Sequence, residues 1–237
     1  MRIEIWSDIA CPWCYIGKTR FEAALAEYEH KDSVEVVWRS YELQAGAPKR
    51  DPEPAIAHLM AKYGRSQGEV LEMLARVTEE AAKEGLEYHL DKAVSASTFD
   101  AHRLIHFAAE RGLGHEAMTR LMQAYQGEGA DVSDPDTLVR LGAEVGLVGD
   151  EVRTLLAGDE YGADVLADER RARSLGVSGV PFFVIDELHG ISGAQPREFF
   201  LAALRQLGPQ VRPVVMLDPA GAAAGACTDD SCELPQS

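Results

Sequence analysis

The order of its predicted elements constrains the fold of this chain more than any other feature. Residues 2–7 (RIEIWS) and 34–43 (VEVVWRSYEL) are typical of strands, and the segment between them has apolar residues at helical spacing. A strand–helix–strand unit predicts parallel strands joined by a right-handed crossover. Near the other end, residues 180–186 (VPFFVID) and 189–194 (HGISGA) predict two more strands, and residues 195–208 predict a helix.

Between these two halves the sequence has helical patterns alone. Gly and Pro residues separate the helical segments, and a Pro-rich linker precedes them. We therefore predict an α/β fold that an all-helical insertion domain interrupts. In this division residues 1–47 and 176–208 form a discontinuous α/β domain, residues 48–175 form the insertion, and residues 209–237 form a flexible C-terminal tail.

The composition limits the partners of the protein. Of the 237 residues, 46% are apolar, which suffices for a large core, and the formal net charge of −16 repels nucleic acids and anionic lipid surfaces. No window approaches the roughly 20 apolar residues that a membrane-spanning helix needs, and the N-terminus lacks the apolar core of a secretory signal. We expect a cytoplasmic protein with neither a nucleic-acid nor a membrane partner.

The four cysteines form two close pairs, Cys11 with Cys14 and Cys227 with Cys232. Structural disulfides are rare in a reducing compartment, so close pairs there indicate redox chemistry or metal binding. The alternative for Cys11 and Cys14 is that both are small buried hydrophobic residues. Their position favours redox chemistry, because the C-x-x-C spacing opens the first helix of a strand–helix–strand unit.

The predicted helix start gives the two cysteines different roles. Cys11 lies about where the helix begins, and Pro12 takes the first helical position, where a missing N–H costs nothing. The unpaired N–H groups and the helix dipole stabilise a thiolate at Cys11, which makes it the attacking sulfur. Cys14 belongs to the apolar residues at helical spacing that face the core, and it is within reach of Cys11. It therefore resolves the mixed disulfide that forms between Cys11 and the substrate. Pro12 and Trp13 then tune the couple and contact the substrate.

At this point a family resemblance is visible. The CPWC motif after a first strand, the long helical insert and the stretch GVSGVPFFVID resemble the DsbA-like branch of the thioredoxin superfamily, and more closely its cytoplasmic FrnE-type members. The resemblance extends to about residue 208. It implies a thioredoxin-like fold interrupted by the helical insertion, disulfide exchange between Cys11/Cys14 and protein thiols, and a cis-proline loop at Val180–Pro181 that faces the couple.

The resemblance also implies further roles. The Val180 backbone would pair with an extended substrate as an added strand. Glu4 on the first strand would be a buried acid with a raised pKa that relays protons to Cys14, the alternative being that Glu4 points to solvent at the edge of the sheet. The tail cysteines Cys227 and Cys232 would be a second redox couple, since a flexible tail raises its local concentration at the first couple. The alternative is an idle or accidentally oxidised tail pair. The expected partners are protein thiols and disulfides, glutathione or a thioredoxin-type reductant, and we expect no cofactor and no metal.

Two other function classes stay open. Both cysteine pairs together could form a four-thiolate zinc site, although their surroundings share no rigid arrangement. Glutathione-dependent isomerases of the 2-hydroxychromene-2-carboxylate isomerase type share the insert but typically have serine for the attacking cysteine, whereas this chain keeps Cys11 and Cys14. His102, His106 and Glu110 fall at helical spacing, a pattern that we assign to core or surface before metal binding.

Overall fold

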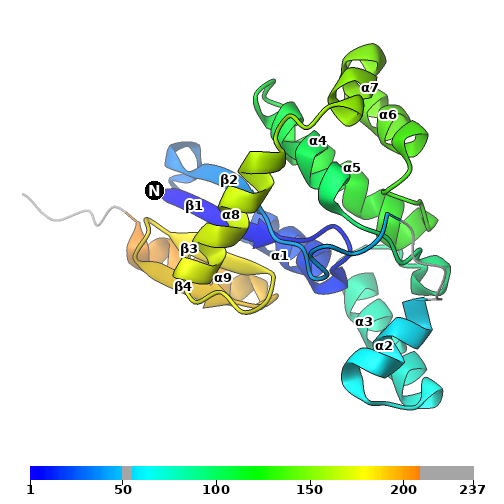
Figure 1. The fold of residues 1–237 in the computed structure, drawn as a ribbon. Coiled ribbons are helices and arrows are strands. Elements are labelled where there is room, and N and C mark those ends of the chain that lie inside the picture. The colour runs from blue at the N-terminus through cyan, green and yellow to red at the C-terminus, as the bar shows by residue number, and fades with distance from the viewer. Residues whose placement is uncertain (50–54, 209–237) are drawn as a thin grey trace, which may run out of the picture.

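A computed structural model describes residues 1–49 and 55–208 (Figure 1). Its sheet has the strand order β2-β1-β3-β4. Strands β1 and β2 are parallel, and β1 with β3 and β3 with β4 are antiparallel. The predicted parallel pair and the predicted hairpin are therefore confirmed. The strands are β1 (Arg2–Ser7), β2 (Glu35–Ser40), β3 (Phe182–Ile185) and β4 (His189–Ser192).

One face of the sheet packs on helices α1 (Pro12–Glu27) and α9 (Arg197–Leu207). Ile3 and Ile5 of β1 point to this side, because successive side chains of a strand alternate between its faces. They meet an aromatic cluster in which the Phe183 and Phe200 rings lie edge to face with centroids 4.7 Å apart, and Phe21 of α1 joins them. This core fixes α1, and with it the cysteines at its start, against the sheet.

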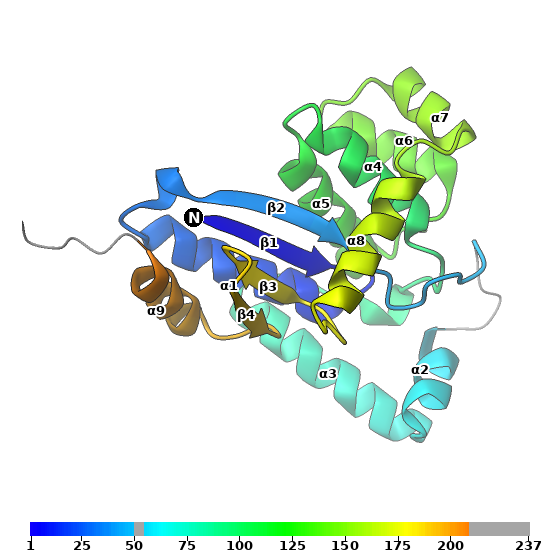
Figure 2. The ribbon, with the colours of Figure 1, turned by 60° about the vertical axis from the view of Figure 1, so that its left-hand side comes forward.

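Helix α8 (Gly162–Ser174) covers the other face (Figure 2). Trp6 of β1 is fully buried there, and its indole Nε1 donates a hydrogen bond of 2.9 Å to the Asp168 carbonyl. Ala172, Val177 and Val184 complete this apolar layer. Our sequence-based division placed residues 162–174 in the insertion, and their packing on the sheet is a feature that helical periodicity does not report.

The helices between β2 and α8 build a second core. Its fully buried centre comes from α4, α5, α6 and α7, and Ile9, Cys11 and Cys14 belong to the same cluster. The couple therefore lies where the sheet and the helical part meet. The helices are α2 (Ala55–Tyr63), α3 (Gln67–Lys83), α4 (Phe99–Ala109), α5 (Gly114–Gln123), a π-helical turn (Ala124–Glu128), α6 (Pro135–Glu144) and α7 (Gly149–Ala157).

Local sequence signals set several helix ends. The Asp134 side chain accepts a 2.8 Å hydrogen bond from the Thr137 N–H, and Pro135 takes the first position of α6, as the sequence predicts. Gly112 and Gly146, which follow the ends of α4 and α6, have φ of 73° and 99°, a conformation that glycine adopts without strain. None of the helices that the structure describes is long and apolar enough to cross a membrane.

Candidate active site

Cys11 is the N-cap residue of α1, with Pro12 in the first helical position. Its backbone is extended, with φ of −85° and ψ of 111°, so the sulfur lies at the end where the first N–H groups of the helix have no intrahelical partner. The Cys11 Sγ donates a hydrogen bond of 3.5 Å to the Val180 carbonyl, and the residue is 5% exposed. A thiolate formed here faces the positive end of the helix dipole.

Cys14 is more deeply buried, with 1% exposure. Burial raises the pKa of the Cys14 thiol well above its usual value, and the hydrogen bond and charge of Cys11 raise it further. The Ser7 side chain and the Asp8 backbone act in the opposite direction and offset a part of this rise in the pKa. Cys14 is therefore a neutral thiol at neutral pH, and both cysteines are free in this structure. It must lose its proton before it can attack.

The loop that faces Cys11 has a cis peptide bond between Val180 and Pro181, as the family resemblance implied. The loop lies close to α1 because Gly17 has no side chain. A Cβ atom at Gly17 would lie 2.9 Å from the Cγ atom of Pro181 and 3.3 Å from the Cα atom of Ala194. Gly17 therefore allows the loop and the helix to approach each other.

A pocket of about 320 Å³ opens beside the couple. Cys11, Pro12, Trp13 and Val180 line one side, and Trp13 is 39% exposed. The opposite wall is mostly apolar and comes from α2 and α3, with Leu59, Met73, Leu74 and Val77 among its side chains. Polar groups also line the pocket, namely Asp8, Gln44, His58, Lys62, Ser95, Thr98 and Gln126. An apolar cavity with a few polar groups beside a reactive sulfur is typical of a substrate site.

Two side chains that sequence reasoning missed fix the segment around Cys11. The Tyr88 hydroxyl donates a 2.7 Å hydrogen bond to the Pro12 carbonyl. Gln126, fully buried in the π-helical turn, donates through Nε2 to the Ile9 carbonyl at 2.9 Å. Short π-helical turns occur often at functional sites, but the sequence around residue 126 has no signal that predicts one.

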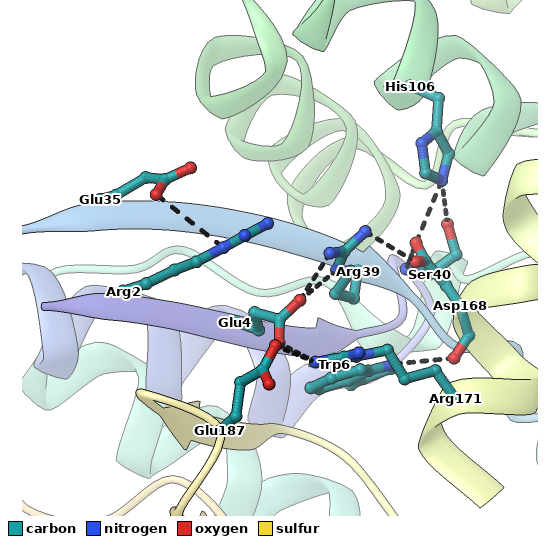
Figure 3. Close-up of polar contacts among 10 residues, drawn as sticks. All are labelled: Arg2, Glu4, Trp6, Glu35, Arg39, Ser40, His106, Asp168, Arg171 and Glu187. Atoms are coloured by element: carbon teal, nitrogen blue, oxygen red, sulfur yellow. Dashed lines mark hydrogen bonds and ion pairs between the residues drawn. The ribbon is translucent and has the colours of Figure 1, made fainter. Parts of the chain in front are cut away.

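The structure does not bring Glu4 to the couple, and the predicted raised pKa is wrong. Glu4 alternates with Ile3 and Ile5 on β1, so its side chain lies on the α8 face of the sheet, opposite α1. There it accepts hydrogen bonds from Arg39 of β2 at 2.9 Å and Arg171 of α8 at 2.7 Å (Figure 3). Burial acts to raise the pKa of Glu4, but these two guanidinium groups outweigh it and the pKa is lowered.

The same face carries a network that ties α8 to the sheet. Arg39 also donates to the Asp168 carboxylate at 3.0 Å, and Asp168 accepts from the Ser40 backbone N–H at 3.0 Å. The His106 Nε2 lies 3.2 Å from Asp168 and 3.1 Å from the Ser40 hydroxyl (Figure 3). Glu4 and Asp168 thus hold strand β2 and helix α8 together, which is a structural role.

A second group of buried ionisable side chains surrounds Glu42, just after β2. We call Asp8, Glu42, His102 and Glu169 the acid cluster. Burial and the charges of Glu169 and Asp8 raise the pKa of Glu42 to about 7, although His102 and Ser97 oppose the rise. Sequence reasoning missed Asp8 and Glu42, because only the fold brings them together.

The helical stripe of His102, His106 and Glu110 does not form a metal site. The three side chains do not face one another: His102 meets Asp8, His106 meets Asp168, and the Glu110 carboxylate accepts from the Tyr161 hydroxyl at 2.6 Å. Among the described residues, no group of three or more His, Cys, Asp or Glu side chains could hold a metal ion.

The predicted second redox pair is not tested by the structure. Cys227 and Cys232 both lie outside the described residues. The structure therefore does not place Cys232 or Cys227 relative to Cys11 and Cys14, and their redox role stays a prediction. The zinc alternative needs all four cysteines, so it is not tested either.

The sequence matches the family model of the DSBA-like thioredoxin domain over residues 2–205. The chain therefore belongs to the family of DsbA-like thiol oxidoreductases and has the thioredoxin-like fold with a helical insertion that the sequence predicted. A protein of Bacillus subtilis (strain 168), the uncharacterised YwbO, is 31% identical over 210 residues, which are 86% of this chain and 96% of that protein.

Solved structures give the same family. The crystal structure of a probable DsbA oxidoreductase from Streptomyces coelicolor, SCO1869, is 45% identical, covers 100% of both chains and has a TM-score of 0.85. The cytosolic disulfide reductase DsbM from Pseudomonas aeruginosa, solved with glutathione, is 20% identical over 87% of this chain and 99% of its own, with a TM-score of 0.62. A 2-hydroxychromene-2-carboxylate isomerase is 15% identical over 87% and 95%, with a TM-score of 0.64. The last two likenesses show the fold alone.

Proposed function

We propose that this protein is a thiol–disulfide oxidoreductase that acts on protein disulfides through the Cys11–Cys14 couple. The observation that carries the proposal is the asymmetry of the two sulfurs. Cys11 lies at the helix N-terminus beside the Val180–Pro181 loop, and Cys14 lies beneath it as a buried thiol with a raised pKa. Attack by the first sulfur and release by the second follow from this arrangement.

The reduction of a substrate disulfide takes two steps. The Cys11 thiolate attacks one sulfur of the substrate, a mixed disulfide forms, and the other substrate sulfur leaves with the electron pair and takes a proton. Cys14 then loses its proton and attacks the Cys11 sulfur, which frees the second substrate thiol and leaves a Cys11–Cys14 disulfide. The same steps in reverse order oxidise a dithiol substrate. An enzyme that reduces one disulfide of a substrate and then forms another isomerises the disulfides of that substrate.

The surroundings of Cys11 support an extended peptide as substrate. The Val180 carbonyl already accepts from Cys11 Sγ, so the Val180 backbone lies where an added strand would pair with it. Trp13 offers a partly exposed apolar surface next to the sulfur, and the pocket beside it receives apolar side chains. Main-chain pairing with apolar contacts gives loose sequence specificity, which suits an enzyme with many protein substrates.

Glutathione or a thioredoxin-type reductant would return the couple to its starting state. The pocket supports glutathione, because Lys62 and His58 of α2 line it and glutathione carries carboxylates. The DsbM structure holds glutathione on the same fold. We also propose that this protein is of the FrnE type and acts in the cytoplasm, where the redox poise favours the reduction or isomerisation of disulfides.

A second redox couple in the tail is a further part of the proposal. It rests on the sequence, which places Cys227 and Cys232 with four residues between them in a segment rich in Gly and Ala. Tethering raises the concentration of one couple at the other, so we propose that the tail pair exchanges disulfides with Cys11 and Cys14.

Glutathione-dependent isomerisation is the alternative, and the fold shared with the isomerase favours it. That chemistry needs no resolving thiol, whereas here Cys14 is positioned directly beneath Cys11 on the first turn of α1, and the Cys14 N–H donates to the Cys11 carbonyl at 3.0 Å. The presence of the second sulfur favours disulfide exchange.

The test is reduction of insulin disulfides and reactivation of scrambled ribonuclease by the full chain. We expect Cys11→Ser to abolish both activities, and Cys14→Ser to abolish insulin reduction while retaining a part of the isomerase activity. Cys227→Ser/Cys232→Ser tests the tail couple separately: we expect slower turnover of protein substrates, and unchanged turnover would remove the tail couple from the proposal while leaving the role of Cys11/Cys14 intact. Unchanged activity of Cys11→Ser would contradict the proposal.

A further inference from the structure

Helices α2 and α3 form an arm on one side of the pocket. The arm stands apart from α4, α5, α6 and α7 in both views of the molecule (Figures 1 and 2). Leu59 of α2 and Leu74 of α3 line the pocket, and Val180 lines it from the side of the couple. The shape of the pocket therefore depends on how the arm is held against α1 and the Val180–Pro181 loop.

The apolar contact between the arm and α1 is small. Ile16 of α1 packs with Val77 and Ala81 of α3 in a cluster that also holds Tyr88. Hydrophobic contacts have no preferred direction, so this contact resists separation of the two helices better than it resists a change of their angle. The angle between α3 and α1 therefore needs a second restraint that is directional.

Arg20 of α1 supplies this restraint through three hydrogen bonds. Its Nε donates to the Glu84 carboxylate at 2.6 Å and its Nη2 to the Glu80 carboxylate at 2.9 Å, and both acceptors lie at the C-terminal end of α3. Its Nη1 donates to the Ala194 carbonyl at 3.0 Å. The Arg20 side chain is 13% exposed, and the planar guanidinium fixes the directions of all three bonds.

The segment that contains Ala194 is paired with the loop that faces Cys11. The Gly193 N–H donates to the Pro181 carbonyl at 2.8 Å, and the antiparallel pairing of β3 with β4 continues this contact into the sheet. The sheet therefore fixes the loop, and Arg20 fixes the arm to the loop. Arg20 itself does not line the pocket, so it acts through the elements that it joins.

We propose that Arg20 is a positioning residue that determines which substrates the pocket admits. It holds α3 at a set distance from the Val180–Pro181 loop, so the apolar pocket is formed before a substrate arrives. A preformed pocket binds a large apolar side chain beside the substrate disulfide without the cost of ordering the arm. Protein segments with such a side chain are then the favoured substrates of the proposed disulfide exchange, on which this inference rests.

The test compares two peptides and one small disulfide. Each peptide has one internal disulfide, with Phe beside the first cysteine in one peptide and Ser in the other, and dithiodiethanol is too small to need the pocket. Reduced full-length protein with Cys227→Ser/Cys232→Ser reacts with an excess of each compound. Mass spectrometry of acid-quenched, alkylated samples follows the oxidation of Cys11 and Cys14, and its dependence on peptide concentration gives a maximal rate and a half-saturating concentration.

Arg20→Gln removes the guanidinium that joins α3 to Ala194. We expect the half-saturating concentration of the Phe peptide to rise about fivefold or more, because the arm must then be ordered on binding. The maximal rate, both constants of the Ser peptide and the rate with dithiodiethanol should stay within about twofold, since the sheet still holds the loop beside Cys11. Arg20→Lys keeps the charge but not the three directed bonds, so it should act in the same direction.

The glutamates of α3 test the same contact from its other side. Glu80→Gln/Glu84→Gln should raise the half-saturating concentration of the Phe peptide about as much as Arg20→Gln does. Addition of Arg20→Gln to this pair should have little further effect, because both changes remove one shared interaction. A further rise as large as the first would contradict the proposed link between Arg20 and α3.

Arg120→Gln is the matched control. Arg120 of α5 makes the same kind of bonds, to Glu128 at 2.7 Å and to Glu144 at 2.6 Å, and its side chain is 19% exposed, but none of the three residues lines the pocket. This variant should lower the Tm about as much as Arg20→Gln does and leave the constants of both peptides unchanged.

Three results would overturn the proposal. They are a lower Tm of Arg20→Gln with unchanged constants for the Phe peptide, an equal effect on both peptides, and a slower reaction with dithiodiethanol. If Arg20→Gln does not fold, Arg20→Lys and the glutamine variants at Glu80 and Glu84 give the same comparison. A parent protein that is oxidised by none of the three disulfides would contradict the proposed disulfide exchange itself, which is a different result.

Discussion

Removal of the Glu42 carboxyl should stabilise the folded protein at alkaline pH. The pKa of Glu42 is raised from 4.5 to about 7, so the folded state holds the proton more tightly than the unfolded state. Ionisation therefore costs stability as pH rises from the unfolded value through the folded one. At 1.36 kcal/mol per pKa unit the full effect is about 3 kcal/mol, of which about 2.5 kcal/mol falls between pH 5 and pH 8.

Glutamine cannot ionise, so the Glu42→Gln variant avoids this loss. Urea unfolding of the reduced proteins at pH 5 and pH 8 measures this effect. The free energy of unfolding of the variant minus that of the parent protein should increase by about 2.5 kcal/mol from the lower to the higher pH. Glu72→Gln, at an exposed position of α3, is the control and should follow the parent protein. A difference between variant and parent that is the same at both pH values would refute the reasoning.

The remaining predictions concern the loop, the sheet and the pocket. Gly17→Ala places a methyl group 2.9 Å from the Pro181 ring, which costs about 1–3 kcal/mol, so we expect a lower Tm and slower insulin reduction. Gly68 has open space around it, so the control variant Gly68→Ala should lower neither the Tm nor the rate. Equal behaviour of the two variants would count against the close approach of α1 and the Pro181 loop. Glu4→Gln should destabilise by about 1–3 kcal/mol at pH 7, because two arginines lose their partner. Since the pKa of Glu4 is lowered, this loss should decrease as pH falls below 4.5 in urea titrations and disappear below the lowered pKa. A loss of the same size at every pH would contradict the ion-pair origin. Lys62→Glu should raise the KM for oxidised glutathione severalfold and leave kcat and the KM for an uncharged small disulfide unchanged; an equal rise for both would show that charge is not the cause.

The strand pattern and the CPWC motif were sufficient to predict the architecture. The alternation in RIEIWS and the Val-rich VEVVWRS predicted a parallel pair, and the pair is present with Ile3 opposite Val36. The positions of Cys11 at the start of α1 and of Cys14 on its buried face could be predicted from helix spacing. Their attacking and resolving roles stay a proposal. The role of Cys227 and Cys232 stays a prediction, because both lie outside the described residues.

The error at Glu4 has a physical cause. The alternation of β1 shows that Glu4 and Ile5 face opposite ways, but it does not show which face α1 covers. That depends on Phe21, Phe183 and Phe200, whose contacts form only in the folded chain. The packing of residues 162–174 on the sheet escaped prediction for the same reason, since the helical spacing does not identify Trp6 as the partner.

The acid cluster and the pocket could not be predicted from the sequence either. Asp8, Glu42, His102 and Glu169 come from four separate segments, and no local sequence pattern links them to one another. Their shared burial and the raised pKa of Glu42 are properties of the assembled fold. A buried ionisable group is costly, and its neighbours in the assembled fold decide how far its pKa shifts.

Trapping of the mixed disulfide tests the central claim most directly. The reduced Cys14→Ser variant, with Cys227→Ser/Cys232→Ser, reacts with oxidised glutathione or scrambled ribonuclease, and mass spectrometry of the digested protein locates the adduct. We predict a stable mixed disulfide on Cys11, and its rapid loss to a Cys11–Cys14 disulfide when Cys14 is present. Absence of an adduct on Cys11, or an adduct equally stable with Cys14 in place, would contradict the assignment of the attacking and resolving sulfurs.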